Sequence, residues 1–196
     1  MATLDLATWR SRLRRRLRDE TRANFPDELL DETASAAMAA IFPGYYRFVY
    51  STPMVTDSAG YTAMPAGTDI NHVFDVEETA DKGISSSLPW FKRGVELGGL
   101  DPATSYVIVS FEPFPAPSAT AFAIPERALE LALLYAASTA AESMVFEKAR
   151  WREWEPSDPD RVDENELLNI ADIFGRKFND QMEMGGAMSL PALGVV

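Results

Sequence analysis

The chain has 196 residues, 46% of them hydrophobic and 24% charged, which predicts a globular protein with one sizeable core and room for a small second lobe. Cysteine is absent, which excludes disulfides, thiolate metal sites and cysteine nucleophiles. The formal net charge of −12 argues against a general duplex-binding protein, because such proteins normally have a broad basic surface.

Neither a secretory signal nor a membrane span is expected. The N-terminus runs into arginines without an apolar stretch, and the longest uncharged helical run, Leu131–Ala141, is far shorter than the ~20 residues that a bilayer requires. We therefore expect a cytosolic protein or a component of a soluble assembly.

The positive charge is concentrated at the start of the chain. Residues 1–24 hold seven arginines against Asp5, Asp19 and Glu20, a net charge of +4, whereas the remainder has 11 basic and 27 acidic residues, a net charge of −16. An acidic body suits a wall along which DNA passes without adhering, because like charges repel the phosphate backbone.

The first predicted element is an amphipathic helix, for which Thr3 or Asp5 is a candidate N-cap. Its arginines cover the circumference outside one apolar stripe, so we interpret them as the solvated side of the helix. The stripe is formed by residues at helical spacing, Leu6, Trp9, Leu13 and Leu17.

A second helix is predicted to follow and to pack antiparallel to the first, so that residues 1–44 hold a helix pair. Pro26 suits a first helical turn, Asp27 and Glu28 favour the positive end of the helix dipole, and Pro43 ends the helix. The predicted buried stripe is Leu30, Ala34, Ala37, Met38 and Ile41.

The middle and the end of the chain differ in character. Residues 45–118 are rich in β-branched and aromatic residues punctuated by Gly and Pro, and predict a small antiparallel β lobe. Residues 119–183 predict a second helix pair, of which the first helix is apolar over much of its circumference and therefore central. The last helix has this predicted buried side: Leu167, Ile170, Ala171, Phe174, Phe178 and Met182.

Residues 184–196 carry no charged side chain and predict an extended apolar tail. Two interpretations stay open: an unstructured terminus, or a segment ordered by another chain, for instance as an added strand at a sheet edge. The whole pattern predicts an α+β fold: mainly a bundle of about four helices, with an inserted small antiparallel β lobe and an extended C-terminal tail.

No catalytic, cofactor-binding or metal site is predicted. His72 is the only histidine, and alternation along a strand would point it away from Asp69 and Asp75, so we interpret it as structural. No nucleophile elbow and no phosphate-binding loop occurs. The acidic residues before the last helix are interpreted as capping and dipole compensation: Asp158, Asp160, Asp163, Glu164 and Glu166.

The order of elements resembles the head-to-tail adaptor (connector) proteins of tailed bacteriophages over nearly the whole chain. The two opening helices resemble that family's "LR…LRD" start and the helix with an acidic first turn that follows it. The middle of the chain resembles the family's tyrosine–proline strand and its Val-rich strand. The end of the chain resembles the family's closing helix pair. These segments carry the resemblance: WRSRLRRRLRDE, FPDELLDETASAAMAAIF, GYTAMPAGTDINHVFDVEE, ALELALLYAASTAAESM and NELLNIADIFGRKFNDQMEM.

The resemblance implies a structural virion protein and not an enzyme. It implies a ring of usually about twelve copies below the portal, which extends the DNA channel and joins capsid to tail. The implied partners are the portal ring, a tail or tail-completion protein, other copies of the chain, and genomic DNA that passes without specific binding. The implied location is the neck of the virion, with the host cytoplasm during assembly, and no membrane is involved.

In this interpretation part of the first helix and the tail contact partners. The expected contact residues are Arg14, Arg15 and Arg18 on the helix, facing the portal or a neighbouring subunit, and Met188, Leu190, Leu193, Val195 and Val196 in the tail. Two alternatives remain at this stage: a nucleic-acid-binding module that uses Arg10–Arg22, and a carboxylate-based hydrolase or metal enzyme.

Overall fold

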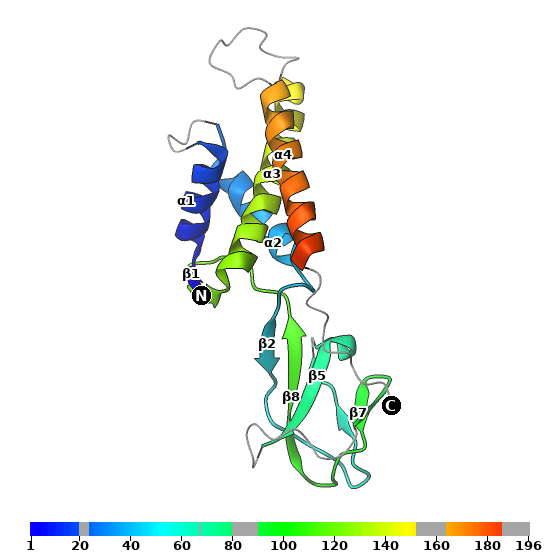
Figure 1. Cartoon of the computed structure of the whole chain (residues 1–196). Helices are drawn as coiled ribbons and strands as arrows, with labels where there is room; N and C mark the ends of the chain where they lie inside the picture. The colour runs from blue at the N-terminus through cyan, green and yellow to red at the C-terminus, as the bar shows by residue number, and fades with distance from the viewer. Residues whose placement is uncertain (20–23, 67, 80–89, 152–163, 186–196) are drawn as a thin grey trace. The chain divides into compact units, whose positions relative to one another are not determined.

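The computed structural model describes residues 1–19, 24–66, 68–79, 90–151 and 164–185. These residues form a mixed α+β fold with four α-helices and several small antiparallel sheets, as predicted (Figure 1). Their contacts divide them into a helical unit, built from both parts of the chain that flank the insertion, and a β unit, Tyr46–Glu112. The predicted lobe of residues 45–118 contains the β unit, whereas Tyr45 and residues 113–118 belong to the helical unit.

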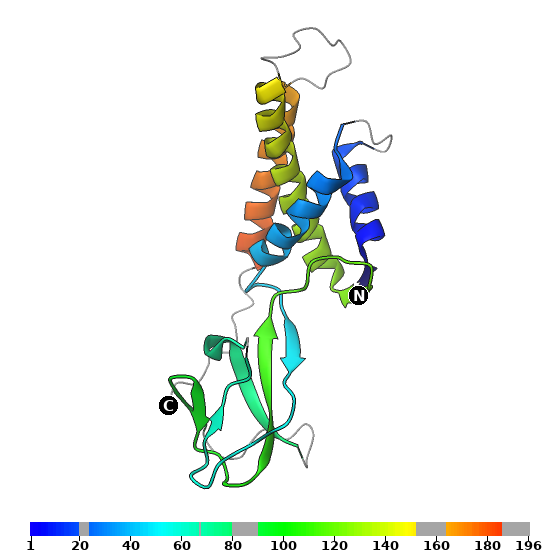
Figure 2. The same cartoon turned by 180° about the vertical axis from the view of Figure 1, so that it is seen from behind.

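The helical unit combines four helices with a two-stranded ribbon. Within it, α3 and α4 lie side by side and antiparallel, and α1 runs in the same direction as α3 (Figures 1 and 2). The elements are β1 Ala2–Leu4, α1 Leu6–Leu17, α2 Asp27–Ala40, β9 Phe122–Ile124, α3 Glu126–Trp151 and α4 Glu164–Gly185.

Both ends of α1 follow from local chemistry. Asp5 is the N-cap, and its Oδ1 accepts a hydrogen bond of 2.7 Å from the backbone N–H of Thr8. At the C-terminal end Arg18 adopts a left-handed conformation, φ 56°, and its N–H bonds to the carbonyl groups of the last turn. Of the two candidates for the N-cap, Thr3 and Asp5, the structure therefore confirms Asp5.

The predicted buried stripe of α2 is confirmed, and so is that of α1 at Trp9, Leu13 and Leu17, whereas Leu6 is half-buried. Trp9 and Leu13 are fully buried, and the Trp9 Nε1–H donates to the Leu30 carbonyl at 3.0 Å, which satisfies the one polar atom of the indole. All five residues predicted for the inward side of the second helix are buried: Leu30, Ala34, Ala37, Met38 and Ile41.

The ribbon of β1 and β9 was not predicted, because strands of three residues are too short to show an alternating pattern. Ala2 pairs with Ile124 and Leu4 with Phe122. The ribbon brings the start of α1 next to the start of α3, and it fixes which residues of the two helices face each other.

The α3 helix is the centre of the helical unit, as its composition predicted, and it contacts α1, α2 and α4. By length and composition alone Glu126–Phe146 is apolar enough to cross a membrane, but 56% of the apolar window is buried inside this chain. Small side chains on α3 let its neighbours approach closely: Ala128, Ala132, Ala136, Ala137 and Ala140, all fully buried.

The α4 helix packs its predicted side on α3. Leu167 and Ala171 are buried, and the Ser138 hydroxyl donates to the Ala171 carbonyl at 2.8 Å. The other predicted residues are half-buried and pack against the same core: Ile170, Phe174, Phe178 and Met182.

The β unit is built around one long strand. β8 is paired antiparallel by β2 and β3 along one edge and by β5 along the other, and a second sheet has the order β4–β7–β6. The strands are β2 Arg47–Tyr50, β3 Met54–Val55, β4 Thr62–Ala63, β5 Val73–Glu78, β6 Phe91–Arg93, β7 Glu96–Gly98 and β8 Ser105–Glu112. The unit has its own small core, formed by Val73, Val76, Leu97, Leu100, Tyr106 and Ile108.

Candidate interaction surface on the first helix

The arginines of α1 are divided between two neighbouring helices. Arg10 and Arg14 pair with acids of α2 and of the turn after α1, while Arg12 and Arg16 pair with acids of α3. The prediction of a uniformly solvated arginine side is therefore wrong, because four of the six arginines from Arg10 to Arg18 pair with the chain's own carboxylates.

Arg10 binds two carboxylates of α2 with its planar guanidinium. Its Nε donates to Asp31 Oδ1 at 2.7 Å, its Nη2 donates to the other oxygen of Asp31, and its Nη1 donates to Asp27 Oδ2 at 3.0 Å. The hydrogen bonds to Asp31 raise the pKa of Arg10 above its ordinary value. Asp27 and Asp31 lie one helical turn apart, so both can face the same arginine.

The prediction that Arg14 contacts a partner is wrong, because only 6% of this residue is exposed. Its Nη1 donates to Asp19 Oδ2 and its Nη2 to Asp27 Oδ1, both at 2.6 Å. The left-handed turn at Arg18 brings Asp19 back over the last turn of α1. A helical wheel, which treats the helix as isolated, puts Arg14 in solvent and misses this closure.

Arg12 and Arg16 form a short ladder with α3. Arg12 Nη1 donates to Glu126 Oε1 at 2.6 Å, and Arg16 Nη2 donates to a carboxylate oxygen of Glu130. The two arginines are four residues apart on α1, and the two glutamates are four residues apart on α3. Because the two helices run in the same direction, each arginine lies opposite one glutamate. These pairs are partly exposed and contribute little stability individually.

Arg15 and Arg18, the other two predicted contact residues on the helix, are exposed. Neither guanidinium forms a hydrogen bond or ion pair with the part of the chain that the structure describes. Both remain available to a partner, which is compatible with their predicted role and does not test it.

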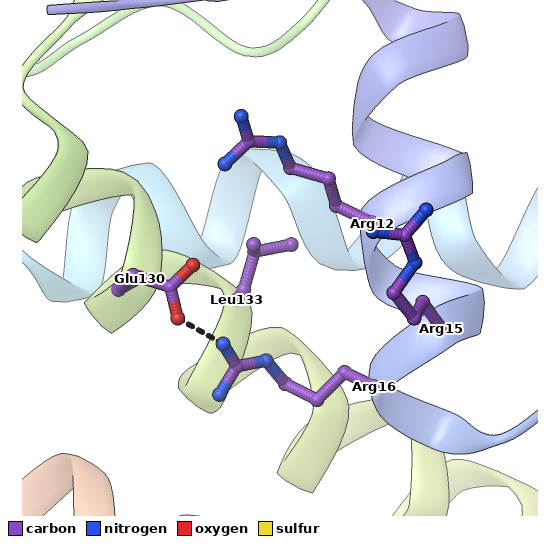
Figure 3. Close-up of a pocket in the computed structure, with 5 residues that line it drawn as sticks. All are labelled: Arg12, Arg15, Arg16, Glu130 and Leu133. Atoms are coloured by element: carbon purple, nitrogen blue, oxygen red, sulfur yellow. Dashed lines mark hydrogen bonds and ion pairs between the residues drawn. The ribbon is translucent and has the colours of Figure 1, made fainter.

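A cavity of about 300 Å³ lies between α1 and α3. Figure 3 shows Arg12 and Arg16 extending from α1 toward α3, where Arg16 meets Glu130, with Arg15 held nearer to α1. The wall therefore presents three guanidinium groups against one carboxylate and one apolar side chain. Its residues are Arg12, Arg15, Arg16, Glu130 and Leu133.

The remaining predicted sites are either outside the described residues or differ in detail. His72 lies in a 3-10 turn, Ile70–His72, and not on the strand, so its Nε2 lies 4.0 Å from Asp69 Oδ2 instead of pointing away. Among the described residues no group of His, Asp or Glu is arranged to hold a metal ion. The predicted tail contacts lie outside the described residues: Met188, Leu190, Leu193, Val195 and Val196.

The acidic partners of the arginines were not predicted as such, although their spacing carried a signal. Asp27 and Asp31 repeat at four residues, as do Glu126 and Glu130, and each pair matches a pair of arginines on α1. Charge repeats of opposite sign and equal spacing on two helices indicate facing surfaces. Their use required knowing which helices are neighbours.

Comparison with known proteins found no matching family model and no matching curated protein.

Proposed function

We propose that this protein is a head–tail adaptor of a tailed bacteriophage, which forms a ring below the portal, extends the DNA channel and joins capsid to tail. It acts as a structural component and not as an enzyme. Its partners in this proposal are the portal ring, further copies of itself and a tail-completion protein, and it acts in the neck of the virion after assembly in the host cytoplasm.

The observation that supports the proposal best is the order of elements. Two helices, an inserted antiparallel β unit and a second helix pair follow one another along the chain, and both helix pairs join in one core. This is the architecture that the resemblance to adaptor proteins implies.

The distribution of acidic residues also supports a channel component. Outside α1 the chain is strongly acidic, and an acidic bore would let DNA slide without adhering. Exposed carboxylates occur on both units, and these are the candidates for the bore: Glu28, Glu32, Asp57, Asp69, Glu96, Asp101, Glu142, Asp172, Asp180 and Glu183.

The ion pairs of α1 count against the alternative of a nucleic-acid-binding module. Arg10, Arg12, Arg14 and Arg16 are held by carboxylates of the same chain. A phosphate backbone would meet these carboxylates beside the arginines and would be repelled by an acidic body. We therefore expect no saturable binding to duplex DNA at physiological salt.

Reconstitution with a portal ring tests the proposal. We expect the purified chain to sediment as a monomer alone and to co-sediment with portal rings from the same genome. The double variant Leu190→Asp/Leu193→Asp should lose this co-sedimentation, and Leu168→Asp, an exposed position on α4, is the matched control that should retain it. Absence of the wild-type chain from portal rings and from purified virions would overturn the proposal.

A further inference from the structure

We propose that the cavity between α1 and α3 is a socket for carboxylates, occupied by the acidic segment Glu153–Glu166 of a second copy of this chain. This inference takes its setting, contacts between neighbouring subunits of a ring, from the proposed function. The segment lies largely outside the described residues, and its part in the proposal depends on its composition.

The socket has unused hydrogen-bond donors. Each guanidinium carries five N–H donors in a fixed plane. Arg12 and Arg16 each spend one donor on a glutamate, and Arg15 spends none on the described residues. A ligand with several acceptor oxygens can therefore bind to all three arginines without displacing Glu126 or Glu130.

The mixed polar and apolar lining of the wall favours a peptide with separate carboxylates over a phosphate backbone. Glu130 lines the cavity and Glu126 binds Arg12 beside it, so the local charge is only slightly positive. Side-chain carboxylates spaced along a peptide can approach the arginines one at a time, and Leu133 offers an apolar contact for their methylene groups.

The segment Glu153–Glu166 has the complementary composition. Its sequence EWEPSDPDRVDENE carries seven carboxylates and one arginine, which makes it the most acidic stretch of the chain. Its two prolines restrict the conformations of the free segment, so less conformational entropy is lost when it binds.

Chain length favours a second copy as the donor. Leu133 lies eighteen residues before the end of α3 at Trp151, a distance of about 27 Å along the helix axis. The twelve residues 152–163 join the ends of α3 and α4, so their midpoint reaches at most about 22 Å from either end. The backbone of the segment therefore ends about 5 Å short of Leu133 in its own chain even when fully extended, whereas the segment of a neighbour is under no such restraint.

A synthetic peptide of residues 153–166 tests the inference without a portal ring. Its binding to the full-length chain is measured by fluorescence anisotropy of a terminal dye at low salt. We expect saturable binding that weakens at least tenfold in the variant Arg15→Glu. The matched control Arg18→Glu makes the same charge change on the same helix outside the cavity, and it should change affinity less than threefold.

Three results would overturn the inference. They are no saturable binding of the peptide, an equal loss of affinity in both variants, and tighter binding of a single-stranded DNA of equal charge. A peptide with every Asp and Glu replaced by Asn and Gln should not bind, and the melting temperature of each variant confirms folding. Because no portal is present, failure of the adaptor proposal leaves this result unchanged, and failure here leaves portal binding to be judged separately.

Discussion

Arg14 and Asp19 form an ion pair at the end of α1, with Nη1 and Oδ2 2.6 Å apart and side chains that are 8% and 1% exposed. The Asp19 carboxylate also accepts backbone N–H bonds from Asn24 and Phe25. One buried carboxylate thus connects the last turn of α1 to the chain that leads into α2. The arginine predicted to meet another protein stabilises the fold instead.

Replacing Arg14 with methionine should destabilise the protein by about 3 kcal/mol, because the buried Asp19 carboxylate would lose its ion pair with Arg14. Urea unfolding measures the change. The matched variant Arg15→Met, at an exposed position one residue away, should change the free energy of unfolding by less than about 0.5 kcal/mol.

The double variant Arg14→Met/Asp19→Asn should recover part of the loss, since it removes the buried charge together with its partner. Equal unfolding curves for the Arg14 and Arg15 variants would contradict the buried pair.

A double-mutant cycle on Arg16 and Glu130 should give a coupling energy of about 0.5 kcal/mol, because the pair is partly exposed to solvent. The coupling should fall as salt is raised from low to physiological concentration. A coupling above about 2 kcal/mol, or one that does not respond to salt, would show that the pair is buried more deeply than described.

Asp5 makes the stability of α1 depend on pH. The backbone N–H of Thr8 lowers the pKa of Asp5 below its ordinary value of 3.8. A lowered folded-state pKa contributes stability above pH 3.8 that is lost as the pH falls through the folded value. Asp5→Ala should therefore lower the melting temperature by a few degrees at pH 7, and this difference should shrink as the pH falls below 3.8. A difference that is constant with pH would reject the charged cap.

Gly60 and Gly94 provide a matched test of the β unit. A Cβ on Gly60, at φ +77°, would lie 2.2 Å from the Leu100 carbonyl oxygen, whereas a Cβ on Gly94, at φ +62°, meets nothing within 4 Å. Gly60→Ala should cost about 2–4 kcal/mol because the loop must shift. Gly94→Ala should cost about 1 kcal/mol from backbone strain alone. Thermal unfolding compares the two variants. Equal losses of stability would show that the Leu100 carbonyl does not lie against Gly60.

Periodicity predicted α1, α2 and α4 well because each of these helices buries one continuous stripe. Trp9 and Leu13 on α1, and Leu30 and Met38 on α2, follow the 3.6-residue repeat and are buried as expected. The composition of α3 also predicted its central position, since a helix apolar on most sides must be surrounded.

Features that depend on long-range contacts were missed. The ribbon of β1 and β9 pairs residues about 120 positions apart through strands too short to show a pattern. The burial of Arg14 depends on the reversal of the chain at Arg18, which no periodicity encodes. The position of His72 in a 3-10 turn depends on a local change of conformation just before β5.

The cavity and the arginines that line it could likewise not be predicted from the sequence. It requires that α1 and α3 run in parallel, so that Arg16 meets Glu130 while Arg15 stays free of the described chain. Charge repeats on separate helices can be recognised as one surface only when the packing of those helices is known.

A cryo-electron microscopy reconstruction of the virion neck tests the central claim most directly. The account predicts a ring of this chain directly below the portal, with the arginine cavity of each subunit against the acidic segment of the next. A neck in which the portal contacts the tail through a different protein, with this chain absent from the particle, would contradict it.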